Sequence, residues 1–240
     1  MEKLVTVSRV DLHYGGPPVI HHVSFDGEAG QLIGLVGPNG AGKTTLLLAL
    51  SGQFRPAGGE IYCFGQDIYL QNLLYKKQIS YVHESPFFYN HLTVIESLQF
   101  IARIKHVNNQ SADEQIERLL QAGSLEKERN KLTSQLSFGM RKKLAIIAAL
   151  MGNPRIIFLD EALNGVDIES SFTIKELLKA YVKEGGLVFL STHIVEIVEK
   201  LCDRYLVLKN GELIADRPAA KGVADLEQEL LRLFHRTEDC

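Results

Sequence analysis

The sequence has no tryptophan, and it lacks two features that would each indicate a class of protein. It has only three cysteines among 240 residues, and it has no apolar run of the roughly 20 residues that a membrane-spanning helix requires. Cys63, Cys202 and Cys240 are odd in number and have no C-x-x-C spacing, which predicts free thiols rather than a disulfide framework or a zinc site. The first residues lead into strand-like alternation and not into the apolar core of a signal peptide. We therefore expect a chain that stays in the cytosol and does not itself cross a bilayer.

An excess of charge of one sign is lacking as well. The chain has 26 lysines and arginines against 29 acidic residues, a formal net charge of −3, so nothing in its charge favours nucleic acid as a partner. Hydrophobic residues make up 45% of the sequence. That content and the length are sufficient for one large domain, or one core with an inserted subdomain.

The sequence does contain a complete phosphate-binding loop. A predicted buried strand at 32–36 leads into it and a predicted helix at 44–50 follows it, the context that such a loop requires. Backbone N–H groups of the loop can point at phosphate oxygens, and the helix N-terminus adds a favourable dipole. Lys43 would reach the β- and γ-phosphates, and the Thr44 hydroxyl would bind Mg²⁺. The loop consists of Gly37, Pro38, Asn39, Gly40, Ala41, Gly42, Lys43, Thr44 and Thr45.

Strand patterns occur in two groups that a helical stretch separates. Apolar runs predict strands at 4–12, 19–25, 60–64, 79–82, 155–159 and 187–190, and an Asn-Gly turn predicts a hairpin over 205–215. Capping residues predict helices at 93–105, beginning after Thr93, at 111–122, beginning at Ser111, and at 137–151, capped by Ser137. A further helix is predicted at 167–183, and Leu226, Leu230, Leu233 and Phe234 lie at helical spacing in the tail.

This pattern predicts an α/β fold with a P-loop NTPase core. We expect a mainly parallel sheet, an N-terminal antiparallel β part and an inserted helical subdomain. The chain would form a single domain over 1–240. Its nucleotide-binding core would comprise 1–83 and 152–216, the helical subdomain 84–151, and a short helical tail 217–240.

Two consecutive carboxylates, Asp160 and Glu161, end the apolar strand at 155–159. An acid at a strand end beside a phosphate loop can hold Mg²⁺ directly or through water, which is the role predicted for Asp160. Glu161 would point to the opposite side and act as the general base for a water in line with the γ-phosphate. The alternative is a solvated strand end, but the phosphate loop favours the functional interpretation.

Together these motifs resemble the ATP-binding cassette (ABC) ATPases, and the resemblance extends over residues 3–216. Further stretches match the family in order and spacing, each weak singly and specific together. They are 136–140 (LSFGM) at the signature, 161–167 at the D-loop, 191–193 (STH) at the switch histidine, Tyr14 at the adenine-stacking position, 79–84 at the Q-loop and 207–213 at the closing hairpin.

The resemblance implies that two cassettes bind two ATP molecules head to tail, each between the phosphate loop of one and the signature of the other. Ser137 and Gly139 would contact the γ-phosphate in trans, and Asp167 would communicate across the dimer. His193 would hold the γ-phosphate and the attacking water, and Tyr14 would stack on adenine. Ordinary alternatives stay open, since Asp167 can be a helix N-cap, Tyr14 a packed aromatic and His193 a structural histidine.

The sequence departs from the family pattern at the signature and at the Q-loop. Phe138 and Met140 replace a glycine and a glutamine, and Glu84 stands where glutamine is usual, as a third carboxylate that could also bind Mg²⁺. The S-x-G-M pattern resembles cassettes that serve exporters of drugs, peptides, lipids or polysaccharides. The basic run at 141–143 is interpreted as a solvated helix face.

These features predict the ATPase subunit of a transporter, with export favoured over import. Its partners would be ATP, a separate membrane-spanning subunit, and a second cassette, identical or different, on the cytoplasmic face of the membrane. The aromatic segment 85–92 would dock on the membrane subunit, or would only cover the helical subdomain. The alternative function is a soluble ABC ATPase that acts on a cytosolic assembly such as cluster biogenesis. A P-loop kinase or GTPase is disfavoured because no guanine-binding N-K-x-D motif is present.

Overall fold

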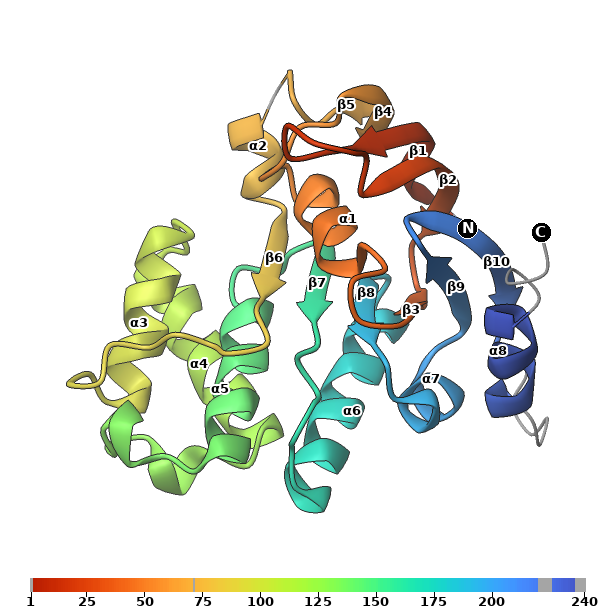
Figure 1. Ribbon diagram of the computed structural model, residues 1–240. Helices are drawn as coiled ribbons and strands as arrows, with labels where there is room; N and C mark the ends of the chain where they lie inside the picture. The colour runs from red at the N-terminus through yellow and green to blue at the C-terminus, as the bar shows by residue number, and fades with distance from the viewer. Residues whose placement is uncertain (1, 71, 220–225, 236–240) are drawn as a thin grey trace.

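The computed structural model describes residues 2–70, 72–219 and 226–235, so Cys240 lies outside the described residues. The chain forms two sheets, with helices around the larger one (Figure 1). The smaller sheet is antiparallel, in the order β2-β1-β4-β5. Its strands are β1 (Lys3–Leu12), β2 (Ile20–Glu28), β4 (Gly58–Cys63) and β5 (Gln66–Asp67). The antiparallel N-terminal part predicted from the sequence is thereby confirmed.

The larger sheet is parallel except at one edge, in the order β10-β9-β3-β8-β7-β6. Its central strands β3, β7 and β8 are buried along their whole length, which explains their continuous apolar sequences. Because these strands are parallel neighbours, their carboxyl ends meet at one edge of the sheet, where ligands bind in such folds. The strands are β3 (Leu32–Val36), β6 (Ile79–Val82), β7 (Ile156–Asp160), β8 (Leu187–Thr192), β9 (Arg204–Lys209) and β10 (Glu212–Pro218).

Two apolar cores lie on the two sides of the larger sheet. Helix α1 (Lys43–Leu50) packs in the core shared with the antiparallel sheet. The other core contains apolar residues from the remaining long helices, and α7 contacts α8, whose Leu226 and Leu230 are buried. Leu226, Leu230 and Leu233 of the apolar face predicted for the tail thus pack against the body of the protein, and the side chain of Phe234 lies outside the described residues. The helices are α2 (Asn72–Lys76), α3 (Val94–Ile104), α4 (Asn109–Ala122), α5 (Phe138–Leu150), α6 (Ile168–Lys183), α7 (Val195–Leu201) and α8 (Leu226–His235), with 3₁₀ turns η1 (Glu126–Glu128) and η2 (Thr133–Gln135).

Helices α3, α4 and α5 all lie between β6 and β7 in the chain and gather on one side of the molecule (Figure 1). The capping residues predicted at Thr93, Ser137 and Asp167 are confirmed, because each side chain accepts a backbone N–H of the helix that follows it. The start predicted for α4 was wrong. Asn108 caps this helix by accepting the N–H of Ser111, so the helix begins before the Ser111 that the sequence pattern favoured. Within the described ranges, every helix is too short or too polar to span a bilayer.

Candidate nucleotide-binding site

The loop between β3 and α1 has a backbone that requires glycine. Gly40 and Gly42 have φ values of +82° and +98°, a conformation that residues with a side chain rarely adopt. A Cβ added to Gly42 would lie 2.5 Å from a methyl carbon of Ile20, and one on Gly37 would lie 2.3 Å from the carbonyl oxygen of Leu208. Helix α1 begins at Lys43 directly after Gly42, which has no side chain to cap it. Its first N–H groups are therefore oriented to bind an anion.

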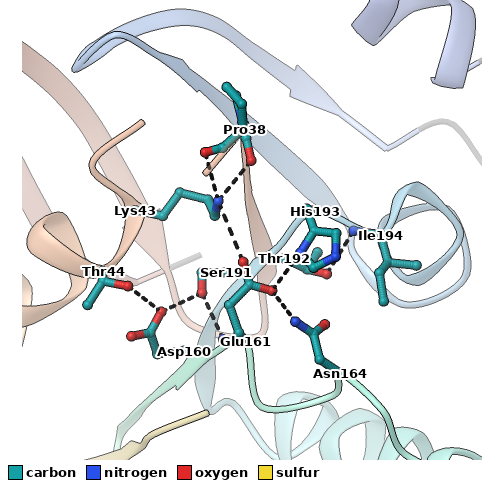
Figure 2. Close-up of polar contacts among 11 residues, drawn as sticks. Pro38, Lys43, Thr44, Asp160, Glu161, Asn164, Ser191, Thr192, His193 and Ile194 are labelled. Carbon is teal, nitrogen blue, oxygen red and sulfur yellow. Dashed lines mark hydrogen bonds and ion pairs between the residues drawn. The ribbon is translucent and has the colours of Figure 1, made fainter. Parts of the chain in front are cut away.

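Lys43 is buried at the bottom of this loop. Its ammonium donates to the carbonyls of Gly37, at 2.8 Å, and Pro38, at 3.1 Å. It also lies 3.5 Å from a carboxylate oxygen of Glu161 (Figure 2). These contacts fix the charge of Lys43 between the phosphate loop and the end of β7. A phosphate beside the loop would thus meet a cation that is already in position.

Asp160 ends β7 and accepts hydrogen bonds from three hydroxyl groups. The donors are Thr44, at 3.0 Å, Ser191 on β8, at 2.7 Å, and Tyr81 on β6, at 3.1 Å. Burial, and then the adjacent Asp160 carboxylate, raise the pKa of the Tyr81 hydroxyl well above its ordinary value, so Tyr81 remains a donor. The Thr44 and Asp160 oxygens predicted to bind Mg²⁺ are therefore in contact with each other.

The side chains of Thr44, Asp160 and Glu84 fit Mg²⁺ only if phosphate oxygens and water supply the rest of its ligands. Thr44, Asp160 and Glu84 offer the hard oxygen ligands that Mg²⁺ prefers. However, within the part of the chain that the structure describes, no three histidine, cysteine or acidic side chains form a group that could hold a metal ion. Mg²⁺ in proteins commonly takes one or two carboxylates and completes its shell with phosphate oxygens and water, which is compatible with this arrangement.

Glu161 faces nitrogen donors, whereas Asp160 faces hydroxyls. Asn164 donates to one oxygen of the Glu161 carboxylate at 2.7 Å, and Nδ1 of His193 lies 3.2 Å from the same oxygen (Figure 2). The other oxygen faces Lys43. The φ of Glu161 is +49°, and its backbone N–H donates to Ser191, so a left-handed turn directs the side chain away from Asp160. The sequence predicted that strand alternation would separate the two carboxylates, but β7 ends at Asp160 and the left-handed turn at Glu161 directs its side chain instead.

These groups surround a cavity of about 500 Å³. Nine of the residues predicted for the site line it, together with Val19 and Asn164: Asn39, Gly40, Gly42, Lys43, Thr44, Thr45, Glu84, Glu161 and His193. Tyr14 lies beside the loop. Its half-exposed ring packs on Phe54, with ring centroids 4.5 Å apart, and its hydroxyl is 3.4 Å from the Thr45 hydroxyl. Stacking of Tyr14 on adenine stays a prediction.

Ser137, Gly139 and Asp167 do not line this cavity but are adjacent to one another in the chain's own fold. Ser137 caps α5 by accepting the N–H of Met140, and Asp167 caps α6 by accepting the N–H of Ser170. That bond lowers the pKa of the Asp167 carboxyl. A Cβ on Gly139 would lie 2.0 Å from an Asp167 carboxylate oxygen, so close packing of the two helix starts already requires glycine here.

The prediction that the basic run at 141–143 forms a solvated helix face was wrong. Lys142 and Lys143 are 1% and 4% exposed. The sequence also gave no role to Asn164, Ser191 or Tyr81, which contact the two carboxylates. The positions of Ser191 and Tyr81, at or near the ends of strands adjacent to β7, were the available signal, because such ends converge in a parallel sheet.

Comparisons with known proteins agree with this geometry. Residues 20–164 match the family described as ABC transporter. The chain is 31% identical to the SkfA peptide export ATP-binding protein SkfE of Bacillus subtilis, over 99% of both chains. It is 34% identical to the Nod factor export ATP-binding protein I of Rhizobium meliloti, over 88% of this chain and 63% of that protein, so it spans less than two thirds of that relative. A solved structure of an ATP-binding subunit of an ABC transporter, 27% identical, superposes with a TM-score of 0.88 over 96% of this chain and 99% of that one.

Proposed function

The chain belongs to the ABC transporter family of ATP-binding, ATP-hydrolysing subunits, and from this premise we propose that it powers export through a separate membrane-spanning partner. The observation that carries the proposal is the contact of Lys43, His193 and Asn164 with the Glu161 carboxylate beside the phosphate loop. Both relatives named above are export ATP-binding proteins. Their names support transport over the alternative of a soluble ATPase that acts on a cytosolic assembly.

The residues divide the chemistry of hydrolysis between them. The backbone N–H groups of the phosphate loop, which every loop residue except Pro38 carries, and the Lys43 ammonium hold the phosphates and stabilise charge that develops on the γ-phosphoryl group. Glu161 accepts a proton from the attacking water, and His193 orients that water and the γ-phosphate. The leaving group is ADP and the product is inorganic phosphate. Mg²⁺, held by Thr44 and Asp160 with Glu84 nearby, would neutralise phosphate charge.

We infer a cassette with a core at 1–83 and 152–216, a helical subdomain at 84–151 and a tail at 217–240. Two cassettes would close head to tail, so that Ser137 and Gly139 of one contact the γ-phosphate held by the other, Asp167 communicates across the interface, and Tyr14 stacks on adenine. The exposure of Ser137 and Phe138 at the N-terminus of α5, where the helix dipole favours an anion, supports the role of Ser137. The protein would lie on the cytoplasmic face of the membrane, bound to its partner.

The test is the purified variant Glu161→Gln, compared with the parent by ATP hydrolysis and by size exclusion with and without Mg-ATP. Loss of the general base should lower kcat by roughly 10²- to 10⁴-fold and trap an ATP-dependent dimer. Lys43→Ala is the matched control. This substitution removes the phosphate contact of the lysine, so the variant protein should form no dimer with ATP. A Glu161→Gln protein that binds ATP and stays monomeric would contradict the homodimer and require a different partner cassette.

A further inference from the structure

A fully buried lysine near the start of α5 reaches the loop that borders the nucleotide cavity. Lys142 is 1% exposed, the largest of the side chains that are almost completely buried. Its ammonium donates a hydrogen bond to the main-chain carbonyl of Glu84 and lies 5.2 Å from the centre of the Phe138 ring. Glu84 itself lines the cavity beside Lys43 and Thr44. One ammonium thus contacts both the loop after β6 and the first residue of α5.

A buried ammonium is unfavourable unless specific partners compensate for the water it loses. Burial lowers the pKa of Lys142, whereas the negative charges of Glu84 and Glu161 raise it. Both acids line the nucleotide cavity. The positive charge of Lys142 therefore lies close to two carboxylates of the cavity, although no described residue of α5 lines the cavity itself.

The contact at Phe138 lies in the predicted signature, between Ser137 and Gly139. The Phe138 ring is half-exposed on one side. On the other side it packs against the segment before α6, since a Cβ added to Gly165 would lie 3.3 Å from the ring. Phe138 replaces a small residue of the family pattern, and the ring is large enough to contact the Lys142 ammonium. Phe138 and Lys142 are four residues apart in α5 and therefore lie on the same face of the helix.

We propose that Lys142 is a positioning residue that fixes the main chain of Glu84 to the start of α5, so that a shift of Glu84 on nucleotide binding moves Ser137 and Gly139. This role rests on the proposed function, because it presumes that the start of α5 closes on the ATP of a second cassette. Lys142 does not touch the reacting atoms. Its contribution is to make closure of the dimer depend on the occupied cavity.

The experiment compares Lys142→Met, which keeps the length and loses the charge and the hydrogen bond, with Lys142→Arg, which keeps a cationic donor. Arg141→Met is the matched control, a cation lost from the adjacent position of the same helix. Each substitution is made in two backgrounds. In the parent protein we measure kcat and KM of ATP hydrolysis, and in the Glu161→Gln protein we measure ATP-dependent dimerisation. Thermal unfolding without nucleotide identifies the temperature range in which each variant is folded.

We expect Lys142→Met to lower kcat by roughly tenfold, from the loss of one hydrogen bond to a charged group, and to raise the ATP concentration for half-maximal dimerisation by a similar factor. Binding of a fluorescent ATP analogue to the monomer should stay within about twofold, since no phosphate contact is lost. Lys142→Arg should restore most of both losses, and Arg141→Met should match the parent. If Lys142→Met does not fold, Lys142→Gln, which keeps a neutral donor, is measured in its place.

The proposal is overturned if Lys142→Met only lowers the melting temperature while kcat and dimerisation match the parent in the folded range. It is also overturned if Lys142→Arg and Lys142→Met are equally impaired, because packing and not the cation would then matter. Failure of the proposed homodimer is detected separately, because the Glu161→Gln protein that keeps Lys142 would then never dimerise with ATP. In that case, comparison of the kcat values of the Lys142→Met and Lys142→Arg proteins still tests the role of Lys142.

Discussion

At the scale of single residues, two consecutive acids have opposite surroundings. Asp160 continues the extended strand β7 and accepts from hydroxyls, whereas Glu161 has a positive φ and faces nitrogen donors. A non-glycine residue in this conformation is under strain of about 1 kcal/mol or more, which the contacts of its carboxylate and its N–H offset. The strained turn is what presents a carboxylate to the cavity while its neighbour stays at the Thr44 hydroxyl.

Gly139 has a packing role that can be separated from contact with phosphate. A methyl group in Gly139→Ala would overlap the Asp167 carboxylate, so the two helix starts must move apart and the cap of α6 weakens. We expect the free energy of unfolding without nucleotide to fall by about 1–2 kcal/mol, the usual cost of a lost cap or an overpacked contact. Urea denaturation measures it.

A double-mutant cycle with Asp167→Ala identifies the cause of that loss. In the Asp167→Ala background the nearest clash partner is gone and the Ser170 hydroxyl, 2.7 Å from the added methyl, remains, so Gly139→Ala should cost less than in the parent. An equal cost in both backgrounds would show that Asp167 is not the group that the methyl meets.

At the scale of elements, side-chain caps start the long helices and one lysine joins the end of α3 to the end of α5. Lys105, directly after α3, donates to the carbonyls of Ala149 and Met151 and to the Ser80 hydroxyl of β6, at 3.0, 2.6 and 2.7 Å. Carbonyls at a helix C-terminus lack partners within the helix, so a cation there satisfies them. Lys105 thus connects two helices of the helical group to the sheet.

The burial of Lys105 predicts how stability changes with pH. Burial lowers its pKa to about 8 in the folded protein, whereas the unfolded chain keeps the proton to about 10.4. Between these values the unfolded state binds more protons, so the contribution of Lys105 to stability rises with pH, by up to about 3 kcal/mol, and is constant below pH 8. Buried tyrosines and thiols with raised pKa values, such as Tyr181 and Cys63, have the opposite effect above about pH 9.

The measurement is the difference in unfolding free energy between the parent and Lys105→Met in urea at several pH values from 7 to 10.5. Subtracting one unfolding free energy from the other removes the contributions of the tyrosines and thiols, because both proteins contain the same ones. The difference should shift in favour of the parent above pH 8. A difference that is flat over this range would mean that Lys105 keeps its proton in the folded protein.

At the scale of the whole molecule, the segment after the cavity ends in an exposed aromatic group. Phe87, Tyr89 and Phe100 are 79%, 46% and 42% exposed and contact one another edge to face, with centroids 5.4 and 5.6 Å apart. The segment between β6 and α3 that carries two of them runs across the helical group (Figure 1). Because Glu84 lies at the start of this segment, contact with a membrane partner here would be linked to the nucleotide cavity.

Loss of this aromatic group should weaken membrane association. We expect Phe87→Ala/Phe100→Ala to lower the fraction of protein that sediments with membranes of its own host cells by roughly tenfold, as for the loss of central interface aromatics. Leu70→Ala/Leu73→Ala is the matched control, since both leucines are at least as exposed and lie on the segment around α2. An equal loss in both pairs, or none in the phenylalanine pair, would contradict docking at this surface.

Much of the site was predictable because its signals are local in the sequence. The phosphate loop, the strand that ends at Asp160 and the caps at Thr93, Ser137 and Asp167 each depend on residues within a few positions of one another. Hydrogen bonds from a side chain to the N–H three residues later leave a fixed spacing, and buried strands leave continuous apolar runs. The α/β fold class and the antiparallel N-terminal part followed from the same signals.

What the sequence by itself determined is therefore the set of motifs, their order and the elements that carry them. The tertiary structure decided which side chains meet between elements far apart in the chain, since these contacts have no periodic signal. It brought Ser191 and Tyr81 to Asp160 through the order of the parallel strands. It also buried Lys142, whose sequence pattern indicated an exposed face, because packing of α5 against β6 and α6 covers that side of the helix.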